Sequence, residues 1–240
     1  MLLKKYTLIL CLFFILFNCK EELTITFIET KITTSNNNLV EVTIPKAIEN
    51  SIISSEINTE VSNLVIAALQ VGDTDTKTSK SIEESINAFN NEYNAFNTEF
   101  PNISQPWEAQ IDGEILFQSH EVISISITSY VNTGGAHGST HISFLNFNAA
   151  TGKRIKNNDL IKNKAAFETV AKTYFNTAIE DEDDLFEPNE FKLPENIGFT
   201  ENSIILLYNQ YEIAPYSTGI IDFTIPIEKV SAYLSFNSSN

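Results

Sequence analysis

The chain has 240 residues, with 31 acidic and 15 basic side chains and a formal net charge of −16. A surface this acidic repels phosphate backbones, which argues against nucleic acid as a partner and favours a cationic protein. Without an N-terminal leader about 220 residues remain, enough for one large domain or two small interlocked lobes around a real core.

The first 18 residues are expected to be a secretory leader. Lys4 and Lys5 precede an apolar run from Tyr6 to Phe17, which is too short for a permanent membrane span. Cys19 follows directly, and the segment LFNC at 16–19 resembles the lipobox of bacterial lipoproteins. The resemblance implies that Cys19 is acylated and becomes the first residue of the mature protein. The alternative is an ordinary leader with an incidental cysteine.

The residues that follow Cys19 suggest a localisation signal. Lys20-Glu21-Glu22 is similar to the export signal of one class of Gram-negative surface lipoproteins, and the alternative is the start of a solvated linker. We therefore expect a lipid-anchored protein of the outer membrane, on its periplasmic or its outer side. Loss of the leader removes two lysines and leaves 13 basic against 31 acidic side chains, a net charge of −18. The other cysteine, Cys11, leaves with the leader, so no disulfide is expected.

Alternating apolar and polar residues predict a strand at 23–34, a turn at 35–38 and a second strand at 39–44. Beyond Pro45 the apolar residues recur three or four apart up to Ala68, which predicts a helix. A second helix is predicted at 81–100. Ser81 and Glu84 have the spacing of a capping box at its start, and Pro101 ends it.

From Trp107 the period changes to two, and strands are predicted at 111–118, 121–131 and 139–147. Residues 148–153 form a hairpin turn with Gly152 suited to a left-handed position. A helix at 164–179, strands at 204–211 and 219–225 and a short helix at 226–234 follow. Helices interleaved with antiparallel hairpins predict an α+β fold, with antiparallel sheets, packed helices and two similar-sized lobes in one compact module.

The three histidines do not form a recognisable metal site. His137 and His141 have the H-x-x-x-H spacing of a metal pair, whereas His120 stands apart. The corresponding pattern of carbohydrate deacetylases also needs two adjacent aspartates upstream, and Asp183-Asp184 lie downstream. No zincin or two-cysteine motif occurs. We therefore predict no metal and no cofactor.

The remaining acidic residues do not define a catalytic site. The run from Glu180 to Asp184 lacks the ligand spacing and central glycine of an EF-hand, so we interpret it as a charged helix end and loop, with weak calcium binding as the alternative. No nucleophile elbow, Cys/His pair or phosphate-binding glycine loop is present. Carboxylates are abundant, but nothing singles out two of them as a glycosidase pair.

The most unusual local segment is YVNTGGAHG at 130–138. Three glycines in five residues between two strands predict positive φ or a close approach of the backbone to another element. We favour a structural bend with His137 hydrogen-bonded inside, and a ligand loop with exposed backbone donors is the alternative. The structural interpretation predicts that Gly135→Val lowers the melting temperature, because a β-branched residue adopts positive φ poorly.

Two sets of motifs resemble one known extracellular module. The first set comprises Ser129-Tyr130, Gly134-Gly135-Ala136-His137-Gly138, Asn146-Phe147, Thr151-Gly152-Lys153 and Asp159-Leu160. The second set comprises Tyr211-Glu212-Ile213-Ala214-Pro215-Tyr216, Gly219 and Ile225-Pro226. Together they look like the domain shared by RsiV-type anti-sigma factors and the N-terminal part of PdaC-type peptidoglycan deacetylases. The resemblance covers about residues 40 to 235.

The resemblance divides the chain into a leader at 1–18, a tether and first strand at 19–38, an N-terminal lobe at 39–160 and a C-terminal lobe at 161–240. RsiV-type proteins bind lysozyme through this module, but their membrane span and sigma-binding segment are not found in this sequence. The deacetylase domain of PdaC-type enzymes is not found either. The resemblance thus implies a recognition module without its effector.

We therefore expect a lipid-anchored, non-catalytic envelope protein that binds a lysozyme-like cationic protein or peptidoglycan. The alternatives are an enzyme acting on wall glycan and a structural envelope lipoprotein. Tyr216 is the candidate contact, because a tyrosine after a proline between two strands is a rigid aromatic, although core packing is an equal alternative. The candidate binding or structural residues are Tyr130, Gly134, Gly135, His137, Gly138, Tyr211, Pro215 and Tyr216.

Overall fold

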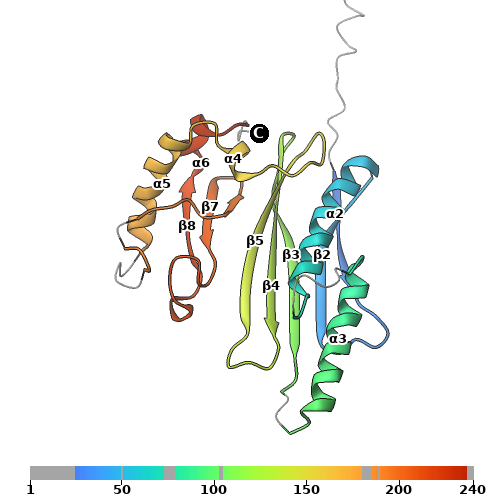
Figure 1. Ribbon diagram of the computed structural model, residues 1–240. Helices are drawn as coiled ribbons and strands as arrows, with labels where there is room; N and C mark the ends of the chain where they lie inside the picture. Colours follow the sequence, from blue (N-terminus) through green and yellow to red (C-terminus); the bar gives the residue numbers. More distant parts are fainter. Residues whose placement is uncertain are drawn as a thin grey trace, which may run out of the picture.

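The computed structural model describes residues 25–236, apart from 50, 73–78, 103–104, 180–184 and 189. The predicted leader, Cys19 and the acidic run at 180–184 lie outside the described residues. Two sheets stand beside each other, one of five strands in the order β1-β2-β3-β4-β5 and one of three in the order β6-β7-β8 (Figure 1).

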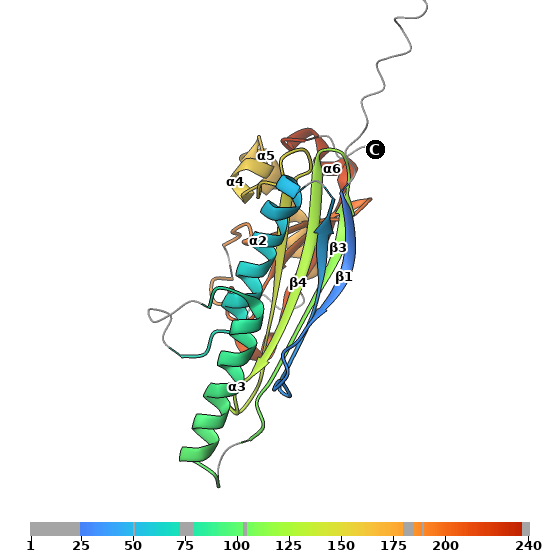
Figure 2. The same cartoon turned by 90° about the vertical axis from the view of Figure 1, so that its right-hand side faces the viewer.

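The five-stranded sheet and its helices form what we call the N-terminal lobe. Its strands are β1 (Thr26–Ile32), β2 (Val40–Ile48), β3 (Glu108–Gln118), β4 (Val122–Asn132) and β5 (Ser139–Asn148). Neighbouring strands are antiparallel except β2 and β3, which run parallel where Val40–Thr43 face Ala109–Asp112. The helices α2 (Ser51–Ala68) and α3 (Ile82–Glu99) cover one face of this sheet (Figure 2).

The helix α3 forms for the reasons that its sequence predicts. The Ser81 side chain accepts a hydrogen bond from the backbone N–H of Glu84 at 3.2 Å, which caps the first turn. Ile82, Ile86 and Phe89 are buried on the face toward the sheet. The stripe of apolar residues is therefore a core surface, as periodicity predicts.

The three-stranded sheet and its helices form what we call the C-terminal lobe. Its strands are β6 (Asn196–Phe199), β7 (Ser203–Tyr208) and β8 (Ile221–Pro226). Its helices are α4 (Asn157–Leu160), α5 (Lys164–Ala178) and α6 (Ile227–Val230), with 3-10 turns η3 (Tyr216–Thr218) and η4 (Ser231–Tyr233). Phe167, Ala171 and Phe175 form the buried face of α5.

Each lobe has its own hydrophobic cluster, and the two lobes interlock. The second cluster contains Phe117 and Val122 from the five-stranded sheet together with β6–β8 and α5. Antiparallel hairpins, packed helices and two sheets in one compact module confirm the predicted α+β class. The division of the chain at residue 160 stays a prediction.

The predicted end of the second strand at Ile44 was wrong, because β2 continues through Pro45 to Ile48. Proline is tolerated there because the pairing of β2 with β3 ends at Thr43, so no ladder bond needs its N–H. Its ring also needs room. A Cβ on Gly113 of β3 would lie 2.6 Å from Pro45 Cδ, so glycine provides that room. The short strand β6 and the parallel pair β2–β3 were not predicted either.

Candidate functional site

The two motif segments, far apart in the sequence, meet beside each other in the fold. The Tyr216 hydroxyl donates a hydrogen bond to the carbonyl oxygen of Gly138 at 2.9 Å. The His137 ring stacks on Tyr216 with ring centroids 5.2 Å apart and planes 17° apart. Tyr211 continues the row, with its centroid 5.8 Å from that of Tyr216. We call these four residues, His137, Gly138, Tyr211 and Tyr216, the motif junction.

Glycine is favoured at two positions of the β4–β5 loop. A Cβ on Gly138 would lie 2.4 Å from three atoms of the Tyr130 side chain, so Gly138 lets Tyr130 pack beneath the loop. Gly134 has φ +80°, a left-handed conformation that favours glycine. Gly135 has neither property, since its φ is not positive and the nearest atom to its Cβ position is 3.8 Å away. The prediction that Gly135→Val is strained by a positive φ was therefore wrong. The positive φ belongs to Gly134.

Tyr211 is presented to solvent by a strained turn. Its side chain is 66% exposed, and its φ of +66° is unusual for a bulky residue. The turn is held by two hydrogen bonds, from the backbone N–H of Asn209 to Glu212 Oε2 at 2.9 Å and from the backbone N–H of Glu212 to Asn209 O at 3.1 Å. Left-handed backbone costs such a residue about 1–2 kcal/mol. Strain of this kind concentrates at functional sites, which makes Tyr211 the strongest candidate contact.

Tyr216 links the two loops, and its role as a ligand contact stays a prediction. It is half-buried in η3, where it joins the two loops through its hydroxyl and its ring. It therefore lies neither in the core nor free at the surface. Pro215 precedes it with φ −60° and is exposed. The structure thus brings together His137, Gly138, Tyr211 and Tyr216, with the Tyr130 side chain against Gly138.

Asparagine side chains fix the C-terminal lobe to the edge of β5. Asn209 Oδ1 accepts from the backbone N–H of Ile142 at 2.8 Å, and Asn209 Nδ2 donates to Ile142 O at 2.9 Å. Asn196 Oδ1 accepts from the backbone N–H of Phe144 at 3.1 Å. These side-chain amides take the place of a neighbouring strand and set the position of the Tyr211 turn. These contacts were not predicted, because hydrophobic periodicity carries no signal for a side chain that pairs with a distant strand edge.

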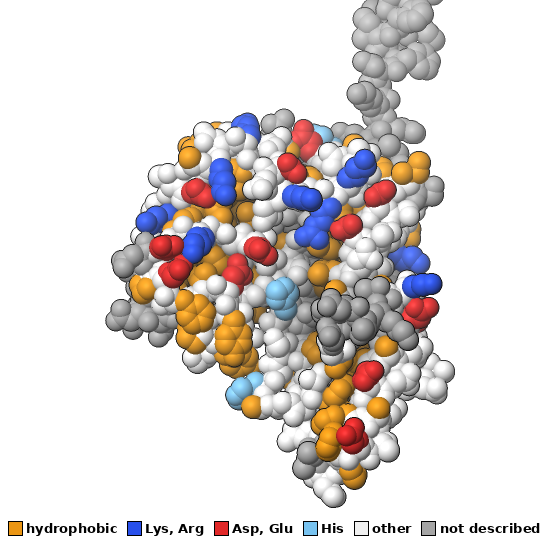
Figure 3. Space-filling model, in the orientation of Figure 1, with side chains coloured by type: hydrophobic (Ala, Val, Ile, Leu, Met, Phe, Trp, Pro, Cys, Tyr) orange, Lys and Arg blue, Asp and Glu red, His pale blue; other side chains and the backbone are white. Residues whose placement is uncertain are grey.

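A hollow of about 510 Å³ lies beside Tyr211 at the seam between the lobes. We call it the seam hollow. In Figure 3, which faces this seam, hydrophobic side chains gather at the lower end of the C-terminal lobe beside a pale-blue histidine. The lining of the seam hollow is polar except for one leucine: Leu64, His141, Ser143, Arg154, Glu195, Asn196, Asn209, Gln210, Tyr211 and Glu212.

The histidines have separate surroundings. His137 stacks on Tyr216, His141 Nε2 lies 3.5 Å from Asn209 Nδ2, and His120 is exposed in the β3–β4 turn. Within the described parts of the chain, no three metal-ligating side chains gather at one place. In the same residues, no helix has the length and apolar character needed to cross a membrane.

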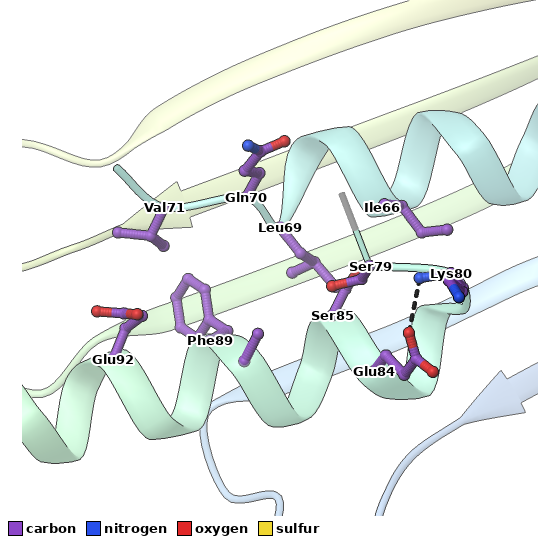
Figure 4. A pocket seen from close by; sticks show the side chains of 11 residues that line it. Ile66, Leu69, Gln70, Val71, Ser79, Lys80, Glu84, Ser85, Phe89 and Glu92 are labelled. Carbon is purple, nitrogen blue, oxygen red and sulfur yellow. Dashed lines mark hydrogen bonds between the residues drawn. The ribbon is translucent and has the colours of Figure 1, made fainter. Parts of the chain in front are cut away.

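A further pocket, of about 570 Å³, lies between the end of α2 and the start of α3 (Figure 4). Leu69 and Phe89 line it together with polar residues, and Glu84 Oε2 accepts from the backbone N–H of Lys80 at 2.7 Å at its rim. None of the residues predicted from the motifs lines this pocket.

Comparison with protein families gives two adjoining matches. Residues 32–140 match the family described as Deacetylase PdaC, and residues 139–228 match the family described as a protein of unknown function, DUF3298. The two matches together span residues 32–228, and the first agrees with the predicted resemblance to PdaC-type proteins. The motif junction joins the two, since His137 and Gly138 lie in the first match and Tyr211 and Tyr216 in the second.

Solved structures share this fold. A DUF3298 family protein from Pseudomonas aeruginosa PAO1 is 19% identical with a TM-score of 0.59, and the alignment covers 90% of this chain and 96% of the other. A member from Bacteroides fragilis NCTC 9343 is 18% identical with a TM-score of 0.63, covering 89% and 93%. No curated protein matches the sequence. At these identities the likeness concerns the fold alone.

Proposed function

We propose that this protein is a lipid-anchored, non-catalytic recognition protein of the bacterial cell envelope, and that the motif junction contacts its ligand. One observation carries the proposal. Residues from both motif segments build a row of rings that ends in Tyr211, an exposed aromatic held in an unfavourable backbone conformation. Exposed, rigid tyrosines are frequent hot spots of protein interfaces.

The first candidate partner is a cationic protein of the lysozyme type. The net charge of −18 after loss of the leader favours fast encounter with a basic partner. Glu108, Asp112 and Glu114 are exposed on β3, and the pairing of Gln110 with Tyr130 places this acidic row beside the strand that enters the glycine loop. Acidic and aromatic groups on neighbouring strands suit a surface rich in lysine and arginine.

The second candidate is the wall glycan. The polar seam hollow beside Tyr211 favours it, because hydroxyl and amide groups match side chains that both donate and accept hydrogen bonds. An enzyme acting on wall sugars and a structural lipoprotein remain the alternatives, and turnover assays on glycan fragments separate these two.

Calorimetry with lysozyme at low and moderate salt tests the first candidate. We expect binding by the chain from Lys20 onward and a lower affinity at about 0.1 M salt, where screening acts over about 10 Å. No heat and no co-elution at low salt would refute it. A pull-down with insoluble peptidoglycan tests the second candidate on the same preparation.

A further inference from the structure

We propose that the seam hollow is a saccharide-binding site, which takes a neutral sugar with hydroxyl and amide groups. This inference rests on the proposed envelope function and develops its second candidate. The site is formed by five parts of the chain: Leu64 of α2, β5, Arg154, the pair Glu195-Asn196 and the turn at 209–212. It adds Arg154 and Gln210, which no motif singles out, to the residues at the motif junction.

Arg154 has hydrogen-bond donors to spare. It is the chain's one arginine and its side chain is 39% exposed. Within the described residues its guanidinium makes two long polar contacts. Nη1 lies 4.0 Å from Glu60 Oε2, and Nη2 lies 3.4 Å from Phe144 O. Burial lowers the pKa of Arg154 and the Glu60 charge opposes this change, which fits a guanidinium with weak partners. A guanidinium has five N–H donors in a rigid fork, so several can face a ligand.

The lining of the seam hollow selects the class of ligand. An apolar ligand would leave its many polar groups without partners, which is costly. An anion would meet the carboxylates of Glu195 and Glu212, which outnumber Arg154. The Glu212 carboxylate already accepts from the backbone N–H groups of Asn209 and Glu195. A neutral molecule with alternating hydrogen-bond donors and acceptors pairs with the polar groups and is not repelled by the carboxylates.

Two further features suit a pyranose ring. Gln210 Oε1 is buried and has no hydrogen-bond partner among the described residues, which is unfavourable in the free protein. Rotation of this amide toward the hollow would let a sugar hydroxyl satisfy it. Tyr211 stands at the rim with an exposed ring, against which the apolar C–H face of a sugar can pack. The guanidinium of Arg154, the amide of Gln210 and the exposed ring of Tyr211 suit a saccharide. Together they match this ligand better than they match a cationic protein surface.

Calorimetry of the full chain in mild detergent, with the trisaccharide of N-acetylglucosamine as the probe, tests the site. We expect saturable binding below about 10 mM. Arg154→Lys keeps the charge but loses the fork, and should weaken binding at least tenfold. Gln210→Met removes an amide that has an unpartnered oxygen, so it should weaken saccharide binding without lowering the melting temperature. A purely structural role of Gln210 would not give this combination.

The matched control is Lys156→Gln, which changes an exposed cation near Arg154 that does not line the hollow. It should bind like the wild type. No heat with the wild type, or equal affinity in Arg154→Lys and the wild type, would overturn the inference. Binding of a short wall peptide in place of the trisaccharide would overturn the ligand class. Lysozyme is titrated into separate samples that contain no trisaccharide, because lysozyme itself binds such sugars, and this keeps the two proposals distinguishable.

Discussion

Gly138 and Tyr130 are a matched pair, in which the missing side chain of one makes room for the ring of the other. Replacement of Gly138 by alanine places a methyl group where three atoms of Tyr130 already lie at 2.4 Å. We expect Gly138→Ala to cost about 1–3 kcal/mol of unfolding free energy through overpacking. In a chain of this size the melting temperature falls by about 2–4 °C for each kcal/mol.

The control is Gly135→Ala, whose added methyl group meets no atom closer than 3.8 Å. It should melt at the wild-type temperature in calorimetric scans. Equal melting temperatures for Gly138→Ala and Gly135→Ala would show that the Tyr130 contact does not constrain the loop. The sequence predicted that this loop matters, but φ and contact distances depend on the folded neighbours, so it did not identify the demanding glycine.

At the scale of strands and helices, asparagine side chains complete the sheet edges. Asn58 of α2 accepts from the backbone N–H of Ala47 at 2.8 Å and donates to Ala47 O at 2.9 Å. This is the geometry that Asn209 adopts on Ile142. Both amides bind the side of a strand on which no other strand pairs with it. They therefore protect backbone groups at a sheet edge that would otherwise be free.

Asn209→Ala removes the side-chain partners of the N–H and C=O of Ile142, which is half-buried. We expect a loss of about 2–4 kcal/mol of unfolding free energy, since each unsatisfied group costs about 1–3 kcal/mol. Urea titration measures the loss, and amide exchange at Ile142 should accelerate. Asn63→Ala, an exposed asparagine on α2, is the control and should change little. Unchanged exchange at Ile142 would contradict the role of Asn209.

Tyr208 at the end of β7 makes the stability depend on alkaline pH. Its hydroxyl donates to Lys192 O at 2.6 Å, and burial raises its pKa, helped by the Glu212 charge. Because the folded pKa exceeds the unfolded value near 10, this contribution is complete below pH about 10. It is lost as pH rises further, by up to about 1.4 kcal/mol per pH unit.

Tyr208→Phe removes this titration. We expect its unfolding free energy to be lower than that of the wild type at neutral pH, by about 1 kcal/mol for the lost hydrogen bond. Between pH 10 and 11 it should decline less steeply than the wild type. Urea titrations at several alkaline pH values give both slopes, and parallel slopes would show that the Tyr208 proton does not contribute.

Local signals predicted some elements and not others. The helix α3 was predictable because Ser81, the apolar stripe and Pro101 all act within a few residues of one another. The strand β2 was predicted to end before Pro45, although it continues to Ile48. Proline is tolerated there because the pairing with β3 has ended, and β3 lies more than 60 residues later in the sequence. The strand β6 has only four residues, too few for a clear alternation. The meeting of Gly138 and Tyr216 is a long-range contact that periodicity cannot encode.

For the whole molecule, the proposed lipid anchor at Cys19 would decide where the interlocked lobes act. We expect Cys19→Ala to abolish membrane association, because the lipobox-like segment is the proposed anchor and several acyl chains hold a protein more firmly than one. Fractionation of cells that express the variant and the wild type measures this. A variant that stays in the membrane pellet would show that acylation of Cys19 is not the sole anchor.

The most direct test of the account concerns Tyr211, because the motif junction is proposed to present this ring to a cationic partner. Tyr211→Asn replaces the ring with a residue that tolerates positive φ. We predict an unchanged or higher melting temperature together with at least a tenfold lower affinity for lysozyme. Ile52→Asn is the control, since Ile52 is 73% exposed at the start of α2, and should bind like the wild type. Wild-type affinity in Tyr211→Asn would contradict the account.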